Sequence, residues 1–170
     1  MNKSYDAGEL NIRPAYAEDL PVIREIFTEG VRYMRAHGNL TQWAGEGFPG
    51  DRAASDIEKG HLFVGADEQD VPHFVFAFII GEDPTYAVIE EGEWPSSAPY
   101  GTIHRAAHDP YTHGVMKAIV PWCLERIPTL RCDTHADNHT MQKRLLACGF
   151  RYSGIIHVAD GSPRLAYQLN

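Results

Sequence analysis

Apolar residues change their spacing along this chain, and each spacing predicts a different kind of element. Continuous apolar runs rich in Val, Phe and Ile are typical of β-strands, and two of them occupy residues 61–66 (HLFVGA) and 73–81 (HFVFAFIIG). Further strands are predicted at residues 9–15, 101–107, 129–134, 150–160 and 164–170, with a short one at 85–90 inside an irregular acidic stretch.

A spacing of three to four residues between apolar side chains predicts the helices. In residues 18–38 this stripe consists of Leu20, Ile23, Phe27 and Met34. Further helices are predicted at residues 51–60, 114–127 and 138–148. Pro121 lies inside the third helix and predicts a kink there. Asp137 is the predicted N-cap of the fourth helix.

The predicted order is strand, two helices, three or four strands, helix, strand, helix and two strands. This order indicates a mixed α/β layer built on one sheet, and it lacks the regular alternation of a doubly wound nucleotide-binding fold. A chain of 170 residues without an internal repeat or a low-complexity linker is most simply one domain, residues 1–170.

Composition excludes several classes of partner. The net charge is −8, and no block of Lys and Arg is present, which argues against a nucleic-acid surface. No stretch approaches the roughly 20 apolar residues that a membrane span needs. Cys123, Cys132 and Cys148 include no C-x-x-C pair and lie among apolar residues, which predicts reduced thiols. Because the N-terminus also lacks the apolar core of a signal peptide, we expect a cytoplasmic protein.

Two stretches in the second half carry a resemblance to a known family. Residues 103–116 (IHRAAHDPYTHGVM) are similar to a stretch in which HRLAV precedes a glycine-containing loop. Residues 130–156 (LRCDTHADNHTMQKRLLACGFRYSGII) are similar to a longer motif found in many bacterial members. The chain thus resembles the Gcn5-related N-acetyltransferase (GNAT) superfamily, over about Leu10 to Tyr167. The resemblance implies an acyl-CoA N-acyltransferase fold: a central, mostly antiparallel, twisted sheet of about six or seven strands, flanked by about four helices.

The resemblance also implies acetyl-CoA as a co-substrate and no metal. In the family, backbone N–H groups at the start of the central helix hold the pyrophosphate, as helix N-termini generally hold anions. The cofactor-binding positions implied here are Ala106, His108, His113, Gly114, Val115 and Asn138. Asn138 matches a position that contacts the pantetheine arm.

The pyrophosphate loop departs from the family pattern. Asp109, Pro110 and Tyr111 stand where basic or small residues are usual, and the loop is shorter by about two residues. Pro110 also removes a backbone donor. Weaker binding of CoA, or loss of that task, is therefore expected from this degraded loop.

His104 is the candidate catalytic residue. In arylalkylamine-acetylating members a histidine at this place on the strand resembles a proton acceptor for the substrate amine, and histidine side chains titrate near pH ~6.5, which suits that task. The alternative is a structural histidine, hydrogen-bonded within the sheet. Many members carry a tyrosine, which protonates the leaving thiolate, at the position of Leu145. Here the thiolate needs another donor or departs unprotonated.

The acceptor site is predicted from two loops. Gln42 and Trp43 follow the first helix, where family members line the acceptor pocket, although Trp43 is equally consistent with plain packing. Glu91, with Glu90 and Glu93 beside it, could hold a cationic amine, and the alternative is a group of solvated loop acids.

The octapeptide CDTHADNH, residues 132–139, allows three interpretations. Asp133, His135, Asp137 and His139 alternate, as the ligands of a metal on one strand would. The resemblance instead implies a strand-to-helix junction, in which these side chains share no face. The third interpretation is a polar helix cap with solvated histidines.

The sequence therefore predicts an enzyme that moves an acetyl group from acetyl-CoA to the amine of a small molecule or a peptide N-terminus, by direct attack on the thioester. The alternative is a non-catalytic domain that binds an acyl-CoA or another ligand. A homodimer is compatible with the sequence.

Overall fold

The computed structural model describes residues 3–170. Its main elements are β2 (Asn11–Pro14), α1 (Leu20–Ala36), α2 (Ala53–Glu58), β3 (Leu62–Ala66), β4 (Pro72–Ile80), β5 (Gly101–His108), α3 (Val115–Leu124), β7 (Leu130–Thr134), α4 (His139–Ala147), β8 (Arg151–His157) and β9 (Pro163–Leu169). This is the order predicted from the spacing of apolar residues. None of the described helices is both long and apolar enough to cross a membrane.

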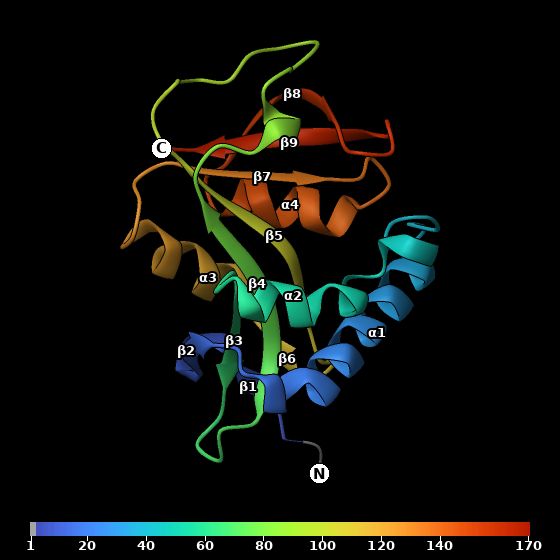
Figure 1. Ribbon diagram of the computed structural model, residues 1–170, viewed down its shortest axis with the longest axis vertical. Helices are drawn as coiled ribbons and strands as arrows, with labels where there is room; N and C mark the ends of the chain where they lie inside the picture. The colour runs from blue at the N-terminus through green and yellow to red at the C-terminus, as the bar shows by residue number, and fades with distance from the viewer. Residues whose placement is uncertain (1–2) are drawn as a thin grey trace.

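Across the described residues, seven strands form one sheet in the order β2-β3-β4-β5-β7-β9-β8. Every neighbouring pair is antiparallel except β5 and β7. The sheet is strongly twisted: β3 and β4 run nearly vertically in Figure 1, whereas β7 and β9 run nearly horizontally. The predicted fold, a mostly antiparallel sheet flanked by four helices, is confirmed.

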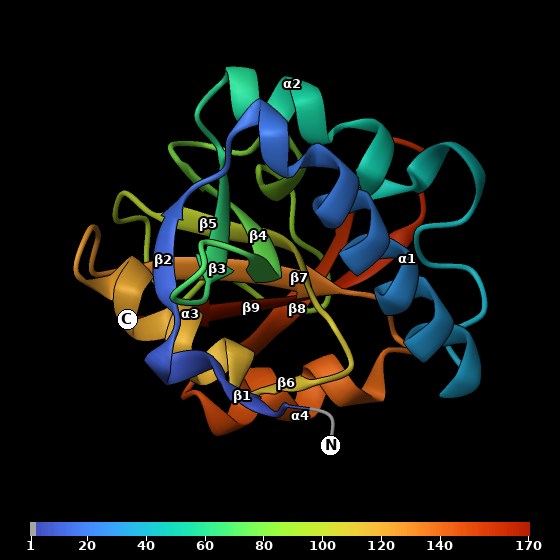
Figure 2. The ribbon, with the colours of Figure 1, turned by 90° about the horizontal axis from the view of Figure 1, so that it is seen from below.

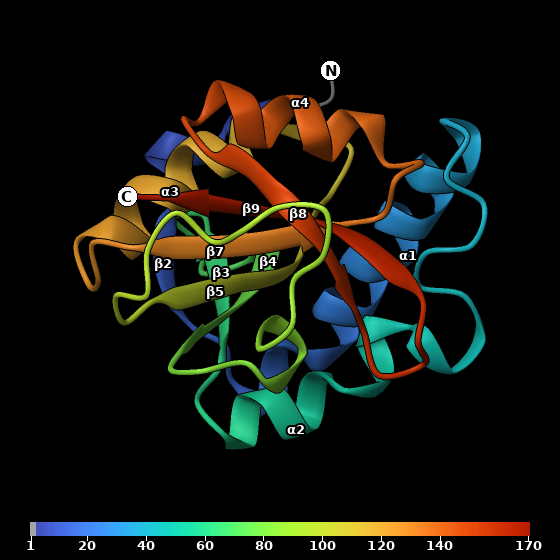
Figure 3. The same cartoon turned by 90° about the horizontal axis from the view of Figure 1, so that it is seen from above.

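Helices cover both faces of the sheet, and β4 shows the effect most clearly. Its side chains alternate between two cores: Phe74 and Phe76 pack with α3 and α4, while Val75 and Ala77 pack with α1 and α2. Figure 3 shows α4 on one side of the strands and α2 on the other. The uninterrupted apolar run of residues 73–81 therefore reflects burial on both faces.

β5 and β7 are parallel neighbours that separate after a short paired segment. Their pairing is limited to Gly101 with Leu130 and Thr102 with Arg131. Among residues 3–170, no strand pairs with β5 beyond Thr102 on its β7 side. This separation opens the middle of the sheet, and the ends of both strands define the site described below.

The N-terminal segment pairs with a strand that is distant from it in sequence. β1 (Tyr5–Asp6) pairs in parallel with β6 (Thr112–His113), just before α3, and Figure 2 shows the two strands together. Ala7, directly after β1, is fully buried in the core that contains α3. The segment is thereby fixed across the loop between β5 and α3.

Three local predictions differ from the structure. The N-cap of α4 is Asn138 and not Asp137, because the Asn138 side chain accepts a hydrogen bond from the N–H of Met141. The short strand predicted at residues 85–90 is absent; a 3₁₀ turn and a single bridge at Glu90 replace it. α3 contains Pro121 as predicted, but its last residue is Leu124.

Candidate active site

A cavity of about 480 Å³ lies where β5 and β7 separate. Its walls come from α1, the loop after α1, β5, β7 and the start of α4. Of the predicted site residues, Gln42, Trp43, His104, Ala106, His108 and Asn138 line it. His113, Gly114, Val115 and Glu91 do not. A second hollow of about 590 Å³, near Tyr5, has none of the predicted residues in its walls.

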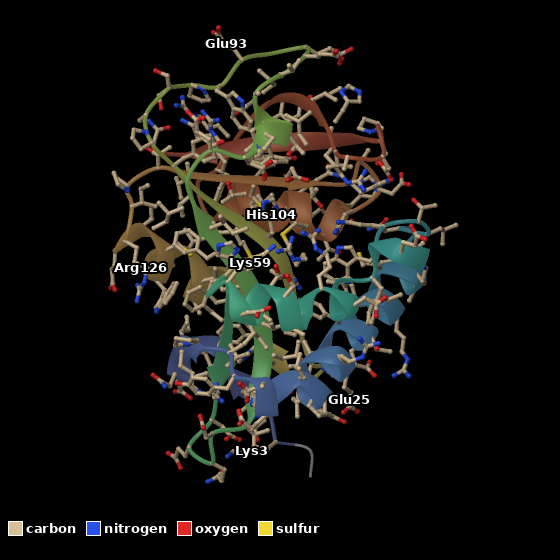
Figure 4. All side chains as sticks on the ribbon, in the orientation of Figure 1. Lys3, Glu25, Lys59, Glu93, His104 and Arg126 are labelled. Atoms are coloured by element: carbon tan, nitrogen blue, oxygen red, sulfur yellow. The ribbon has the colours of Figure 1, made fainter. Side chains whose placement is uncertain are left out.

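His104 occupies a position where its ring meets two carboxylates. Its Nε2 atom lies 3.1 Å from Asp83 Oδ2, and its Nδ1 atom lies 4.0 Å from Asp133 Oδ1. Asp133 Oδ1 in turn accepts a hydrogen bond of 2.6 Å from the hydroxyl of the buried Tyr86. In Figure 4 His104 lies near the middle of the molecule, beside the sheet. A neutral His104 would therefore donate from Nε2 to Asp83 and keep Nδ1 as an acceptor.

Asp83 is held firmly in place. The backbone N–H and the hydroxyl of Thr85 both donate to Asp83 Oδ1, at 2.9 and 2.7 Å, while the Asp83 N–H donates to the hydroxyl of Tyr100. The hydrogen bond from His104, followed by those from Thr85, lowers the pKa of Asp83 to about 2, against desolvation, which acts in the opposite direction. Asp83 is thus a carboxylate at any pH near neutrality.

β5 is irregular next to His104. Ala77 of β4 pairs with His104, but Val75 pairs with Ala107, so two β5 residues stand opposite one residue of β4. Such a bulge takes backbone groups out of the regular ladder. Arg105 and Ala106 line the cavity at this bulge, in the part of β5 that β7 leaves unpaired. An open strand edge of this kind offers N–H donors to a ligand.

Two wall residues have a left-handed backbone conformation that is uncommon outside glycine. Trp43 has φ of 62° and Arg105 has φ of 52°. Strain of this kind, of order 1 kcal/mol or more, is concentrated at functional sites in proteins. The Trp43 ring lies against α1 at Gly30, where an added Cβ would come within 3.2 Å of Trp43 Cζ3. Gly30 therefore provides the space that the Trp43 ring occupies.

Gln42 and Asn138 meet across the cavity. Gln42 Oε1 accepts hydrogen bonds from Nδ2 of Asn39 and from Nδ2 of Asn138, at 2.7 and 3.3 Å. Asn138 Oδ1 caps α4 at the same time. Asn138 thus fixes both the start of α4 and the loop after α1, and this structural role accompanies any contact with a ligand.

The start of α3 is covered by the chain itself. Gly114 is its N-cap, with φ of 73°. His113 Nδ1 lies 2.7 Å from the carbonyl oxygen of Tyr5, and a Cβ on Gly114 would lie 3.5 Å from Asp6 Oδ1. A carboxylate therefore stands close to the helix end at which the sequence predicts a pyrophosphate.

Neither Leu145 nor Glu91 offers a reacting group to the cavity. Leu145 is fully buried in the core. Glu91 is exposed in the loop that follows the 3₁₀ turn, and Figure 4 places its neighbour Glu93 at the tip of this loop, far from His104. Among residues 3–170, no group of three or more His, Cys, Asp and Glu side chains is arranged to hold a metal ion.

Sequence reasoning missed Asp83 and Tyr86 and considered Asp133 only as a metal ligand. Asp83 and Tyr86 belong to the acidic excursion between β4 and β5, which carries no periodic signal. Their relevance depends on the path by which this excursion folds back over His104, and we find no local signal that would have identified them.

The sequence matches none of the protein-family models, and no curated protein matches it significantly. Solved structures do match. A GNAT-family acetyltransferase from Streptococcus agalactiae is 32% identical, with 94% of each chain covered and a TM-score of 0.82. One from Listeria monocytogenes is 19% identical, covering 94% of this chain and 93% of the other, with a TM-score of 0.69.

A phosphinothricin acetyltransferase from Sinorhizobium meliloti, in complex with AcCoA, is 17% identical, with 94% of this chain and 87% of that chain covered and a TM-score of 0.58. At this identity it shares the fold alone. The Streptococcus agalactiae protein is related more closely and over nearly its whole length. The chain described here belongs to the GNAT family of acetyltransferases.

Proposed function

We propose that this protein is an acetyl-CoA-dependent N-acetyltransferase that acetylates the amine of a small molecule or a peptide N-terminus. The observation that carries the proposal is the pairing of His104 with Asp83 in the wall of the cavity between β5 and β7. Membership of the GNAT family supports acyl transfer in general, and the site residues support the amine as acceptor.

His104 acts as the base in this proposal. An amine with a pKa near ~10 is mostly protonated at neutral pH, and only its neutral form attacks a thioester, so a nearby proton acceptor helps. Asp83 holds the proton of His104 on Nε2 and orients the ring, which leaves Nδ1 to take the amine proton. Asp133, 4.0 Å from Nδ1, stabilises the imidazolium that results.

The backbone of β5 polarises the thioester. Its N–H groups at the bulge, beside Arg105 and Ala106, are suited to donate to the carbonyl oxygen on which negative charge develops. The amine nitrogen bonds to the carbonyl carbon, the carbon–sulfur bond breaks, and the amine proton passes to His104. CoA leaves as a thiolate, which is tolerable for a thiol with a pKa of about 8.5.

The test is a thiol-release assay on the His104→Gln variant with a panel of amines. Glutamine is similar in size and polar but cannot take the proton, so kcat/KM should fall by about a hundredfold while the affinity for acetyl-CoA stays within a few-fold. The acidic limb of the pH–rate profile should also disappear. His157→Gln, at an exposed position outside the cavity, is the control. If kcat/KM and the acidic limb both survive in His104→Gln, His104 is structural.

The alternative is a domain that binds an acyl-CoA without turnover. One observation favours it: the buried Leu145 stands where many members carry the acid that protonates the leaving thiolate. Calorimetric titration with acetyl-CoA separates the two functions, because binding without thiol release for any amine supports the alternative, whereas thiol release supports the enzyme.

A further inference from the structure

Arg105 is a buried cation in the cavity wall, next to His104, and two of its guanidinium nitrogens lack a well-aligned hydrogen-bond acceptor. Its side chain is only 13% exposed. Within residues 3–170 its Nε and Nη2 atoms are enclosed without a well-aligned hydrogen-bond acceptor, although Nη2 lies 3.1 Å from Asp56 Oδ2. Leaving a buried charged donor unpaired costs more than about 1–3 kcal/mol, so such atoms require an explanation.

Asp56 of α2 balances the charge of Arg105 but does not satisfy its hydrogen-bond donors. Asp56 Oδ2 lies 3.1 Å from Nη2, close enough for an ion pair, yet the two groups are not aligned as a hydrogen bond. The pair joins α2 to β5. A guanidinium has five N–H donors in a planar fork that matches a carboxylate, and Asp56 lies close to only one of the guanidinium nitrogens of Arg105.

The backbone conformation of Arg105 is a second indication that this residue has a role in the site. Its φ of 52° belongs to the bulge in β5, and this left-handed conformation is unfavourable for an arginine. The bulge places Arg105 and His104 in the wall of one cavity. Near His104 this wall carries Asp133, suited to an ammonium group, and at Arg105 it carries a cation. The cavity wall thus carries charges of both signs, and it also includes Arg32, Arg144 and Arg164.

We propose that the acetyl acceptor carries a carboxylate in addition to its amine, and that Arg105 binds this carboxylate. The inference rests on the proposed function and names its substrate class. The carboxylate pairs with the Arg105 guanidinium where this side chain reaches the cavity, while the amine lies toward His104. The carboxylate itself is unchanged by the reaction, in which the amine becomes an amide.

The test compares amino acids with their carboxamides, which keep the amine and the size but lose the negative charge. Acceptor binding is measured by calorimetry in the presence of CoA, and turnover by thiol release. Arg105→Gln alone would leave Asp56 buried and unpaired, so the double variant Arg105→Gln/Asp56→Asn is used. The control is Arg24→Gln/Asp51→Asn, which removes an exposed arginine–aspartate pair outside the cavity.

In the wild type, at least one amino acid should bind at least tenfold more tightly than its carboxamide. In the Arg105→Gln/Asp56→Asn variant this preference should disappear, through a loss of about tenfold to a hundredfold in affinity for the amino acid alone. The control should keep the preference. Phosphonate analogues of the amino acids extend the panel. If the phosphonates bind in preference to the carboxylates, the assignment is overturned.

The inference is also overturned if the carboxamides bind as well as the amino acids to the wild type, or if the double variant weakens both equally. Failure of the proposed function gives a different result. In that case no amine releases thiol, while the preference for amino acids in binding, and its loss in the double variant, persist.

Discussion

His104 and Asp83 form the smallest unit on which the chemistry depends. A hydrogen bond of 3.1 Å joins them, and Thr85 fixes the carboxylate from the other side. This arrangement sets which nitrogen of His104 carries the proton, because Asp83 accepts and cannot donate at neutral pH. Asp83 does not touch the substrate in our proposal and acts by positioning His104.

Asp83→Asn should lower kcat/KM by about tenfold or more, because an amide can reverse its orientation and no longer defines the tautomer of His104. The pH–rate profile should shift at the same time, since the carboxylate that stabilises the imidazolium is gone. The KM for acetyl-CoA should change little. An unchanged profile with lower activity would assign Asp83 a merely structural role.

Asp83 also predicts how stability depends on pH. Its pKa is about 2 in the folded protein against 3.8 for a free side chain. A lowered pKa gives a contribution that is present above pH ~4 and is lost as the pH falls through ~2. Thermal melts between pH 2 and 4 should therefore show a shallower loss in Asp83→Asn than in the wild type. Equal slopes would show that Asp83 does not contribute.

The excursion between β4 and β5 brings Asp83 and Tyr86 to the site, and Arg131 of β7 holds its far part. The Arg131 guanidinium carbon lies 3.9 Å from the Trp94 ring centroid and 4.0 Å from that of Tyr100. Arg131 also donates to the carbonyl oxygen of Ser96 at 2.9 Å. Cation–π contacts of this kind are strongest when buried, as here.

Arg131→Met keeps the bulk of the side chain but removes the charge and the donors. The free energy of unfolding should fall by about 2 kcal/mol, and limited proteolysis should cut within residues 87–99 more readily. Activity should fall as well, because the excursion carries Asp83. Arg131→Lys, which keeps the charge but not the planar stack, should lie in between. A protease pattern like that of the wild type would refute this account of the excursion.

Segments from three parts of the chain meet in front of α3. Tyr5 stacks on His73 with ring centroids 3.8 Å apart, and His73 hydrogen-bonds Asp67 and Asp109. The N-terminal segment, the β3–β4 turn and the loop before α3 are thereby joined. Asp6 then lies beside Gly114.

If the pyrophosphate of CoA binds at the start of α3, the charge of Asp6 opposes it. Asp6→Asn should then strengthen the binding of CoA by about twofold to tenfold, more at low salt than at high salt. Calorimetry gives the affinity, and Glu9→Gln, an exposed acid in the same segment, is the control. No difference between Asp6→Asn and this control would show that the phosphates lie elsewhere.

The sequence by itself determined the order of helices and strands, the apolar stripes of the two cores, the resemblance to the GNAT superfamily and the choice of His104 as the candidate catalytic residue. These depend on residue spacing within one segment, which a sequence displays directly. Only the tertiary structure decided that Asp83 and Asp133 meet His104, that Arg105 is buried beside it, that Asp6 lies beside the start of α3, and that Glu91 lies outside the cavity. The physical reason is that such contacts join residues distant in the chain, through the paths of loops, the bulge in β5 and the separation of β5 from β7, and local spacing specifies none of these.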